Sequence, residues 1–254
     1  MVAFFVIARY TLLEARRSGM PPIVAASLLA ALVFGAFLSQ VALSEGRELQ
    51  AAIAAALLRA CAVFAVAAHV ASATVREYDD KVLDLGLSLP LSRGAYYLGR
   101  LAGFGAAGTL VALASALPLC LYAPLPVVGL WATSLAFECL LVASMALFFS
   151  MSIAQLVPAL SAALGLYLLG RSIAAIQAIA ASPFAPETTL QTLGQSVIDG
   201  IALVLPRLDL ATDSQWLLYG MPSASEAARV FAGLAVYAAL LAAAGLFDFH
   251  RRNL

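Results

Sequence analysis

The sequence has very little charge. Only 14 basic and 14 acidic residues occur among 254, or 11%, whereas 63% of the residues are hydrophobic. A soluble domain usually has about a quarter of its residues charged and about half apolar. The mean hydropathy is +0.98, and the apolar residues lie in long uninterrupted runs. We therefore expect an integral membrane protein.

The chain also lacks the patterns on which most enzymatic sites depend. It has two histidines and contains no HExxH, no GxSxG and no G-x-x-x-x-G-K-[ST] phosphate loop. Residues 103–110, "GFGAAGTL", are rich in glycine but have no lysine, and they predict close helix packing through small residues. The nearest match to a membrane serine protease, Gly86-Leu87-Ser88, falls in a polar connector rather than in a span. We expect no enzymatic activity in this chain.

Cysteine is scarce as well. Cys61, Cys120 and Cys139 are far apart and lie in apolar runs, which excludes a disulfide framework and a CxxC metal site. We expect all three to be small packing residues, and we expect no metal or other cofactor. The formal net charge is zero, so nothing suggests a nucleic-acid partner.

The sequence has several apolar runs that are long enough to cross a membrane. A helix needs about 20 apolar residues to cross a bilayer. Four single runs satisfy this requirement, at 21–43, 50–75, 101–122 and 227–247. A fifth, 125–181, is long enough for two spans that turn within 150–158, where Pro158 favours a helix start. The sequence thus predicts an all-α, polytopic protein with six transmembrane helices in one domain, residues 1–254.

Six spans put both termini on one side of the membrane, and Lys and Arg decide which side. If the termini are cytoplasmic, three basic residues lie in outer segments and two, Arg59 and Arg171, lie within spans. The other nine lie in inner segments: Arg9, Arg16, Arg17, Arg76, Lys81, Arg93, Arg100, Arg251 and Arg252. This excess predicts a multi-pass protein with both termini cytoplasmic.

Two further segments flank the spans. Residues 3–18 predict an amphipathic interfacial helix, with Phe4, Phe5, Ala8 and Leu12 on one face. Residues 182–226 form an outer segment, in which the apolar run 196–206 is too short to span and predicts a re-entrant or interfacial element.

Much of the charge gathers in the connector between the second and third spans. "REYDDKVLDLGL" predicts a short helix that begins at Arg76, with Glu77 and Lys81 as an i,i+4 pair and Gly86 at its end. The segment "SLPLSRGAYYLGR" then leads into the next span. Taken by itself, the composition favours a solvated loop whose charges hold the topology.

This connector resembles that of the permease subunits of type-2 ATP-binding cassette (ABC) exporters. The resemblance extends to "FECLLVASMALFFS" (137–150), "LGLYLLGRS" (164–172) and the Leu-Pro at 205–206, and it is strongest for the branch that serves copper-enzyme maturation. Asp80 and Lys81 depart from the Gly-Thr of many relatives. The matching connector positions are Glu77, Leu85, Ser88, Pro90, Ser92, Arg93, Tyr97, Gly99 and Arg100.

The resemblance implies a type-2 exporter permease fold and a function in transport. Residues 76–97 would be the cytoplasmic coupling segment, which docks into a separate ABC ATPase subunit that binds ATP and Mg. Two such ATPases would work with this chain and a second permease copy, identical or related, among membrane lipids, and a periplasmic protein is a further expected partner. The implied ATPase-coupling residues are Glu77, Tyr78, Asp79, Asp80, Lys81, Val82, Asp84, Leu85, Ser88, Pro90, Ser92 and Arg93.

Four polar residues fall inside predicted spans: Arg59, His69, Glu138 and Arg171. A charge at the bilayer centre costs about 2.5–3.5 kcal/mol on insertion scales, so each should face protein or water. We expect Glu138 to pair with Arg59 or Arg171, as a buried pair that fixes span packing or as part of a translocation route. We expect His69 to be an interior hydrogen-bonding residue.

Two other functions remain open from the sequence. A secondary transporter or a membrane scaffold would need no ATP, but a transporter of that kind needs coupling-ion ligands at the midplane, and one glutamate is weak support for them. An ATP-using signalling or assembly complex without central translocation would retain the coupling segment.

Overall fold

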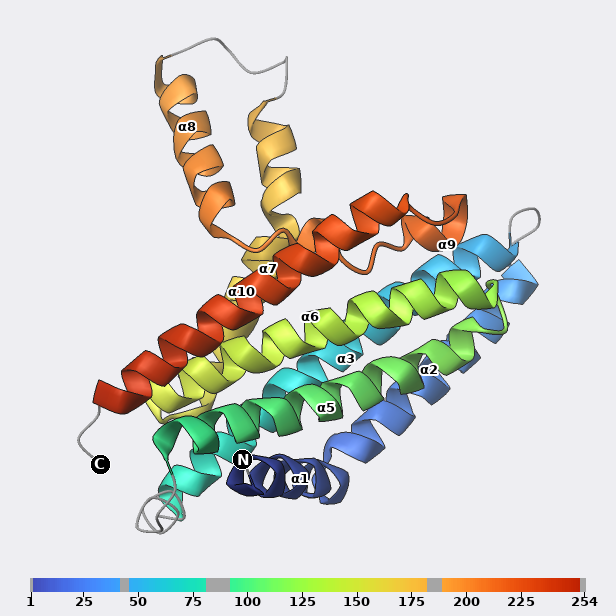
Figure 1. Cartoon of the computed structure of the whole chain (residues 1–254). Coiled ribbons are helices and arrows are strands. Elements are labelled where there is room, and N and C mark those ends of the chain that lie inside the picture. Colours follow the sequence, from blue (N-terminus) through green and yellow to red (C-terminus); the bar gives the residue numbers. More distant parts are fainter. Residues whose placement is uncertain (1, 42–45, 81–91, 182–188, 252–254) are drawn as a thin grey trace.

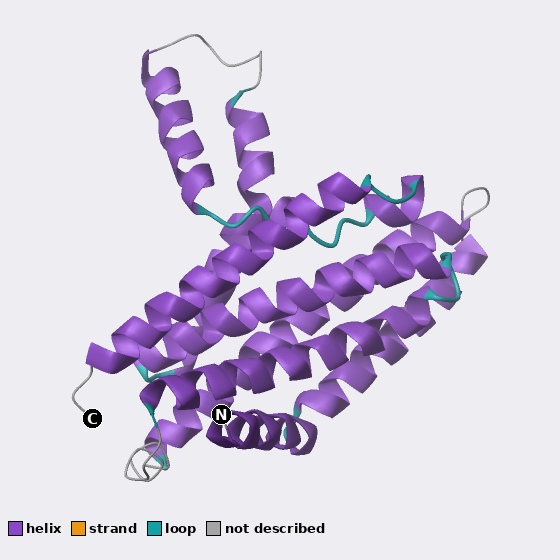
Figure 2. Cartoon of the chain, in the orientation of Figure 1, coloured by secondary structure: helices purple, strands orange, loops and turns teal. Residues whose placement is uncertain are grey.

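The computed structural model describes residues 2–41, 46–80, 92–181 and 189–251, and within these ranges it contains helices and no strands (Figures 1 and 2). Six of the helices are long and apolar enough to cross a membrane, as the sequence predicts. They are α2 (Met20–Val41), α3 (Gly46–Asp79), α5 (Arg93–Leu119), α6 (Leu125–Ile153), α7 (Leu156–Ala180) and α10 (Ala224–Arg251).

The helices on either side of the connector are longer than predicted. The sequence predicts a separate helix that begins at Arg76. This prediction is wrong for the first turn, because Arg76–Asp79 are the end of α3. α5 begins at Arg93 rather than near Leu101, and the Ser92 side chain caps it by accepting a bond from the Ala95 amide at 3.2 Å. The rest of the expected helix and its Gly86 stop lie outside the described residues.

The turn between α6 and α7 falls where it was expected. Ala154 takes a left-handed conformation, with φ of 53°, and its amide bonds to the Ser150 carbonyl at 3.0 Å. α7 follows from Leu156, so Pro158 lies in its first turn, where its missing N–H costs nothing.

The core lies where α3, α5 and α6 pack together, and α2 and α10 are more exposed. Close packing of α5 on α6 uses glycine, as predicted for 103–110. A Cβ on Gly108 would lie 2.9 Å from the Cβ of Cys139, and one on Gly105 would lie 2.7 Å from Leu140. Cys139 is buried and Cys61 half-buried, but Cys120 is exposed, so the expectation that Cys120 packs in the interior is wrong.

The N-terminal helix α1 (Val2–Arg17) packs across α5 and contacts α2 (Figure 1). Phe5 of the predicted apolar face is 66% exposed, and Thr11 and Ala15 are buried. Gly103 allows the contact: a Cβ there would lie 2.5 Å from the Thr11 Cβ and 2.7 Å from the Ala8 carbonyl oxygen.

Within the described part of the outer segment, from residue 189 onward, there are three short helices. α8 (Thr189–Val204) contains most of the apolar run 196–206, which is too short to span, and it projects from the bundle beside the end of α7 (Figure 1). Ala202 and Leu205 pack on Ile173 of α7. A single 3-10 turn, η1 (Leu208–Leu210), and α9 (Gln215–Tyr219) then lead to α10.

Candidate functional site

The two stems of the charged connector are joined by a polar cluster around a buried arginine, which we call the connector clamp: Glu14, Glu77, Tyr96 and Arg100. Arg100, on α5, is 2% exposed. Its Nη1 donates to Oε2 of Glu14 on α1 at 2.8 Å, and its Nη2 approaches Oε2 of Glu77 on α3 at 3.0 Å, as an ion pair outside hydrogen-bond geometry. The Tyr96 hydroxyl donates to the same Glu77 oxygen at 2.7 Å.

The clamp holds one guanidinium against two carboxylates. Thr11 also accepts a bond from Arg100 at 3.2 Å, and the guanidinium carbon lies 4.7 Å from the centre of the Phe104 ring. An unpaired charge at this depth would be costly. Removing Arg100 would leave two acidic groups without a counter-charge, and removing Glu77 would break the polar link between the last turn of α3 and α5.

The helix ends next to the connector are fastened as well. The Tyr78 hydroxyl donates to the Met151 carbonyl at 3.4 Å, which links α3 to the end of α6. Arg93 donates to the Phe249 and His250 carbonyls at 3.4 and 3.3 Å, which links α5 to the end of α10. The connector therefore emerges from a point where α1, α3, α5, α6 and α10 are tied together.

The predicted coupling residues do not all face outward. Glu77 is 14% exposed because it is part of the clamp, whereas Asp79, Asp80 and Ser92 are exposed, and Tyr78 and Arg93 are half-buried. The remaining members, Lys81, Val82, Asp84, Leu85, Ser88 and Pro90, lie outside the described residues.

The sequence reasoning did not identify the clamp as a site. Arg100 was noted only as a match to the family and as a topology charge. The signal in the sequence that Arg100 is buried is helical spacing: Tyr96, Arg100 and Phe104 fall four residues apart, on one face of a span. An arginine on an otherwise aromatic, inward face requires a carboxylate partner, and Glu14 and Glu77 were available.

A second cluster, the outer cluster, consists of Arg59, Ser134, Glu138, Tyr167, Arg171 and Thr212. Glu138, on α6, is fully buried, and its Oε1 lies 3.6 Å from Nη1 of Arg171 on α7. The Tyr167 hydroxyl donates to Oε1 at 2.7 Å, and the Thr212 hydroxyl donates to Oε2. Both carboxylate oxygens thus have protein donors.

The arginines of this cluster hold the loop 205–214. Arg171 donates to the carbonyls of Leu208 and Ala211 at 2.6 and 2.7 Å. Arg59, on α3, donates to the Thr212 carbonyl at 2.9 Å, and the Thr212 amide donates to Ser134 at 2.8 Å. Arg59 and Arg171 were the two partners expected for Glu138. Arg171 forms the ion pair, whereas Arg59 donates to a backbone carbonyl. Thr212 was not identified from the sequence, because a loop threonine carries no periodic signal.

His69 is a member of neither cluster, but it lies beside the clamp, because it packs on the Phe104 ring over which Arg100 lies. It is buried as expected, and its ring packs edge-on against Phe104 with 5.7 Å between centroids. Its Nε2 has no hydrogen-bond partner among the described residues, so the expectation of a hydrogen bond is wrong for this nitrogen.

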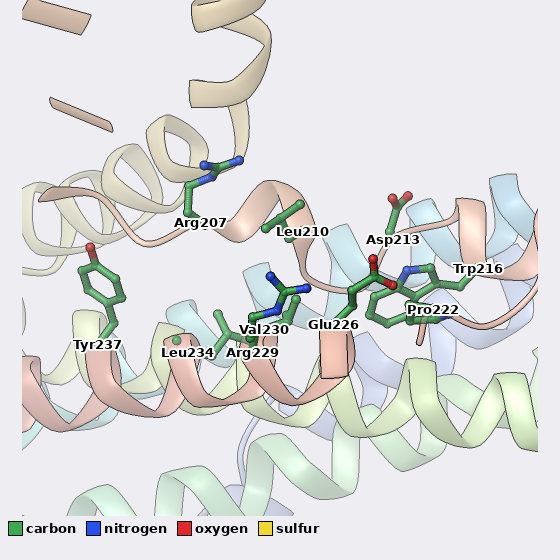
Figure 3. Close-up of a pocket in the computed structure, with 11 residues that line it drawn as sticks. Arg207, Leu210, Asp213, Trp216, Pro222, Glu226, Arg229, Val230, Leu234 and Tyr237 are labelled. Carbon is green, nitrogen blue, oxygen red and sulfur yellow. The ribbon is translucent and has the colours of Figure 1, made fainter. Parts of the chain in front are cut away.

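On the other side of the loop 205–214 is a pocket of about 560 Å³, the outer pocket. Figure 3 shows Arg207, Leu210 and Asp213 on the loop and Glu226 and Arg229 on α10 below it, with the Arg207 and Asp213 side chains directed away from α10. This volume is within the range of about 300–1,000 Å³ that is usual for small-molecule sites. One loop thus separates the buried outer cluster from an open pocket.

Most charges around the outer pocket have local partners. Arg207 pairs with Asp209 at 3.0 Å, and this hydrogen bond raises the pKa of Arg207. Ser223 and Glu226 form a reciprocal capping box at the start of α10, in which the Ser223 amide donates to Glu226 at 2.9 Å and the Glu226 amide donates to the Ser223 hydroxyl at 3.3 Å. Leu210, Val230 and Leu234 line the rest, so the pocket is mainly apolar.

Comparison with protein-family models finds none that matches this chain, and none of the curated proteins matches it.

Proposed function

We propose that this chain is the permease subunit of an ABC exporter of the type-2 class, in a bacterial inner membrane with both termini cytoplasmic. It would pair with a second permease and two ATPase subunits that bind ATP and Mg. The support is the resemblance of residues 76–100, the six apolar helices and the excess of nine inner over three outer basic residues.

The observation that carries the proposal is the connector clamp. Through Glu77, the last turn of α3 contacts Tyr96 and Arg100 in the first two turns of α5. A protein that grips the connector would therefore pull on both stems as one body. Because Arg100 also holds Glu14, the same pull would reach α1. A loop that only preserved topology would not need such a joint.

The carboxylates of Asp79 and Asp80 are the proposed contacts with the ATPase. Both are exposed at the end of α3, next to the buried joint. In our proposal these groups and the following connector residues bind the ATPase, and the clamp transmits its movement without touching it.

At the other end, the loop 205–214 is the natural candidate for a lid over the exit of the pathway. It is held by side chains from α3, α6 and α7, so a change in the packing of these helices would shift its anchors. The outer pocket on its open side would be available to a substrate or to a periplasmic partner.

A secondary transporter is the main alternative, and the outer cluster argues against it. Both oxygens of Glu138 accept bonds from protein groups, and Arg171 lies within ion-pair distance. A carboxylate held in this way is poorly placed to bind and release a coupling ion. An ATP-using assembly complex would share the clamp. It would differ from an exporter in that no substrate passes through its centre.

Purification of the chain from its native membrane tests the proposal. We expect a soluble ATPase to be retained, and the double charge reversal Asp79→Lys with Asp80→Lys should release it while leaving the bundle folded. The matched control is Asp199→Lys, an exposed acidic residue on α8, away from the connector. If no ATPase is retained, or if the reversal and the control behave alike, the proposal is wrong.

Stimulation of the retained ATPase by a candidate substrate would separate transport from assembly. In an exporter, substrate should raise ATP hydrolysis, and Glu77→Gln should reduce this stimulation more than it reduces ATPase retention. A complex without translocation would retain the ATPase and show no stimulation by a transported compound.

A further inference from the structure

An apolar groove of about 280 Å³ lies where α1, α2 and α5 meet. Val24 and Leu28 of α2 form one wall and Val111 and Ala114 of α5 form the other, while the end of α1 closes it with Arg16. This volume is slightly below the range of small-molecule pockets. It suits a section of a chain-like ligand rather than a whole molecule.

The groove opens onto the apolar surface of the bundle. Leu29 of α2 is 64% exposed, and Leu110 and Leu113 of α5 are 52% and 55% exposed. In a six-span protein such side chains face lipid. An acyl chain could therefore enter the groove from the bilayer without crossing water.

The mouth of the groove carries positive charge. Arg16 lines it, Arg9 and Arg17 are exposed on the same short helix, and none of the three forms an ion pair within the described part of the chain. The one carboxylate of α1, Glu14, is turned to Arg100 in the connector clamp. The groove thus combines an apolar interior with an uncompensated cationic rim.

We propose that this groove is a binding site for an anionic phospholipid, with part of one acyl chain between α2 and α5 and the phosphate at Arg16. The inference does not depend on the ABC assignment, because it uses only the groove and the charge of α1. A lipid bound there would hold α1 against α2 and α5 beside the connector clamp.

Native mass spectrometry of the delipidated, folded chain tests the site. Titration with dioleoyl phosphatidylglycerol should show one tightly retained lipid, and dioleoyl phosphatidylcholine, with the same acyl chains, should bind more weakly. Arg16→Gln should weaken phosphatidylglycerol binding about five-fold, since one basic residue near an anionic surface contributes about 1 kcal/mol. The matched control is Arg251→Gln, an exposed arginine at the C-terminal end of α10.

Filling the groove separates a built site from general surface attraction. Ala114→Phe should abolish retention of the lipid, and Ala25→Phe, on the opposite wall and already exposed, should do the same without disturbing the core. Leu113→Phe, on the exposed face of α5, is the control. Circular dichroism and melting check the fold, and Ala25→Phe decides the matter if Ala114→Phe does not fold.

Each result has a defined meaning. Loss of the bound lipid in both filled variants, with retention in the controls, supports the site. Equal binding of the two lipids, or full retention in Ala25→Phe, overturns it. Photo-crosslinking with a diazirine-bearing phosphatidylglycerol gives an independent readout, and labelling confined to α1, α2 and α5 is the expected result.

Discussion

The connector clamp and the outer cluster are both centred on an arginine and a glutamate, but they hold different things. In the clamp, Arg100 joins carboxylates on two other helices. In the outer cluster, Arg59 and Arg171 donate mostly to loop carbonyls. Arg59 and Glu77 are ~27 Å apart along α3, at 1.5 Å per residue, so one helix contributes to both.

This difference indicates how each cluster would respond to force or mutation. A joint made of side-chain charges between helices transmits movement and fails when one charge is removed. A joint made of backbone acceptors fixes a loop in place, and its carbonyls cannot be removed by substitution. We therefore expect the clamp to depend on charge and the outer cluster to depend on shape.

The largest effect should come from removing the cation of the clamp. Arg100→Leu leaves Glu14 and Glu77, which are 28% and 14% exposed, without their counter-charge. We expect it to lower the free energy of unfolding by about 3 kcal/mol, the lower end of the range for a broken buried pair. Unfolding by SDS in detergent micelles measures this. Arg76→Leu, at an exposed arginine just before Glu77, is the matched control and should stay within ~0.5 kcal/mol. Equal losses in the two variants would show that the clamp carries no special energy.

The next effect concerns the outer cluster. Glu138→Gln removes the charge but keeps the size, and Arg171 retains the Leu208 and Ala211 carbonyls, so we expect a loss of about 1–3 kcal/mol. Because the glutamine amide offers one acceptor oxygen to the hydroxyls of both Tyr167 and Thr212, the loop is held less firmly, and limited proteolysis within 205–214 should also become faster. Arg229→Gln, at an exposed position on α10, should change neither property. If Glu138→Gln cost as much as Arg100→Leu, the contrast between the clusters would be lost.

The sequence predicted the outer cluster better than the clamp, for a physical reason. Arg59, Glu138 and Arg171 interrupt apolar runs, and a charge in a span needs a partner. Glu77 and Arg100 lie at span ends next to water, where charge is ordinary, so composition alone did not require their burial. The six spans were predictable from run length, while the continuation of α3 to Asp79 depends on contacts with α5 and α6 that no local pattern contains.

A smaller effect tests whether the clamp depends on the close packing of α1 against α5. A Cβ on Gly103 would clash with Thr11 and Ala8, so Gly103→Ala should destabilise by about 1–3 kcal/mol through overpacking. Gly129→Ala is the control: it is also inside a helix but meets nothing within 4 Å, and it should be neutral or stabilise by up to about 1 kcal/mol. Differential scanning fluorimetry in detergent compares them. A similar melting point for the two variants would mean that α1 adjusts without loss.

The smallest expected effect is a difference between two variants, and it compares the clusters directly, because each cluster has a tyrosine that donates to its glutamate at 2.7 Å. Tyr96→Phe removes a bond to Glu77, which is 14% exposed and can recruit water, so we expect a loss of about 0.5–1.5 kcal/mol. Tyr167→Phe removes a bond to fully buried Glu138, which water cannot replace, so we expect about 1.5–3 kcal/mol. SDS unfolding of the two variants in parallel gives the difference, about 1 kcal/mol. If Tyr96→Phe proved the more costly, the clamp would be the drier of the two sites, and its buried bonds rather than its charges would hold the connector stems together.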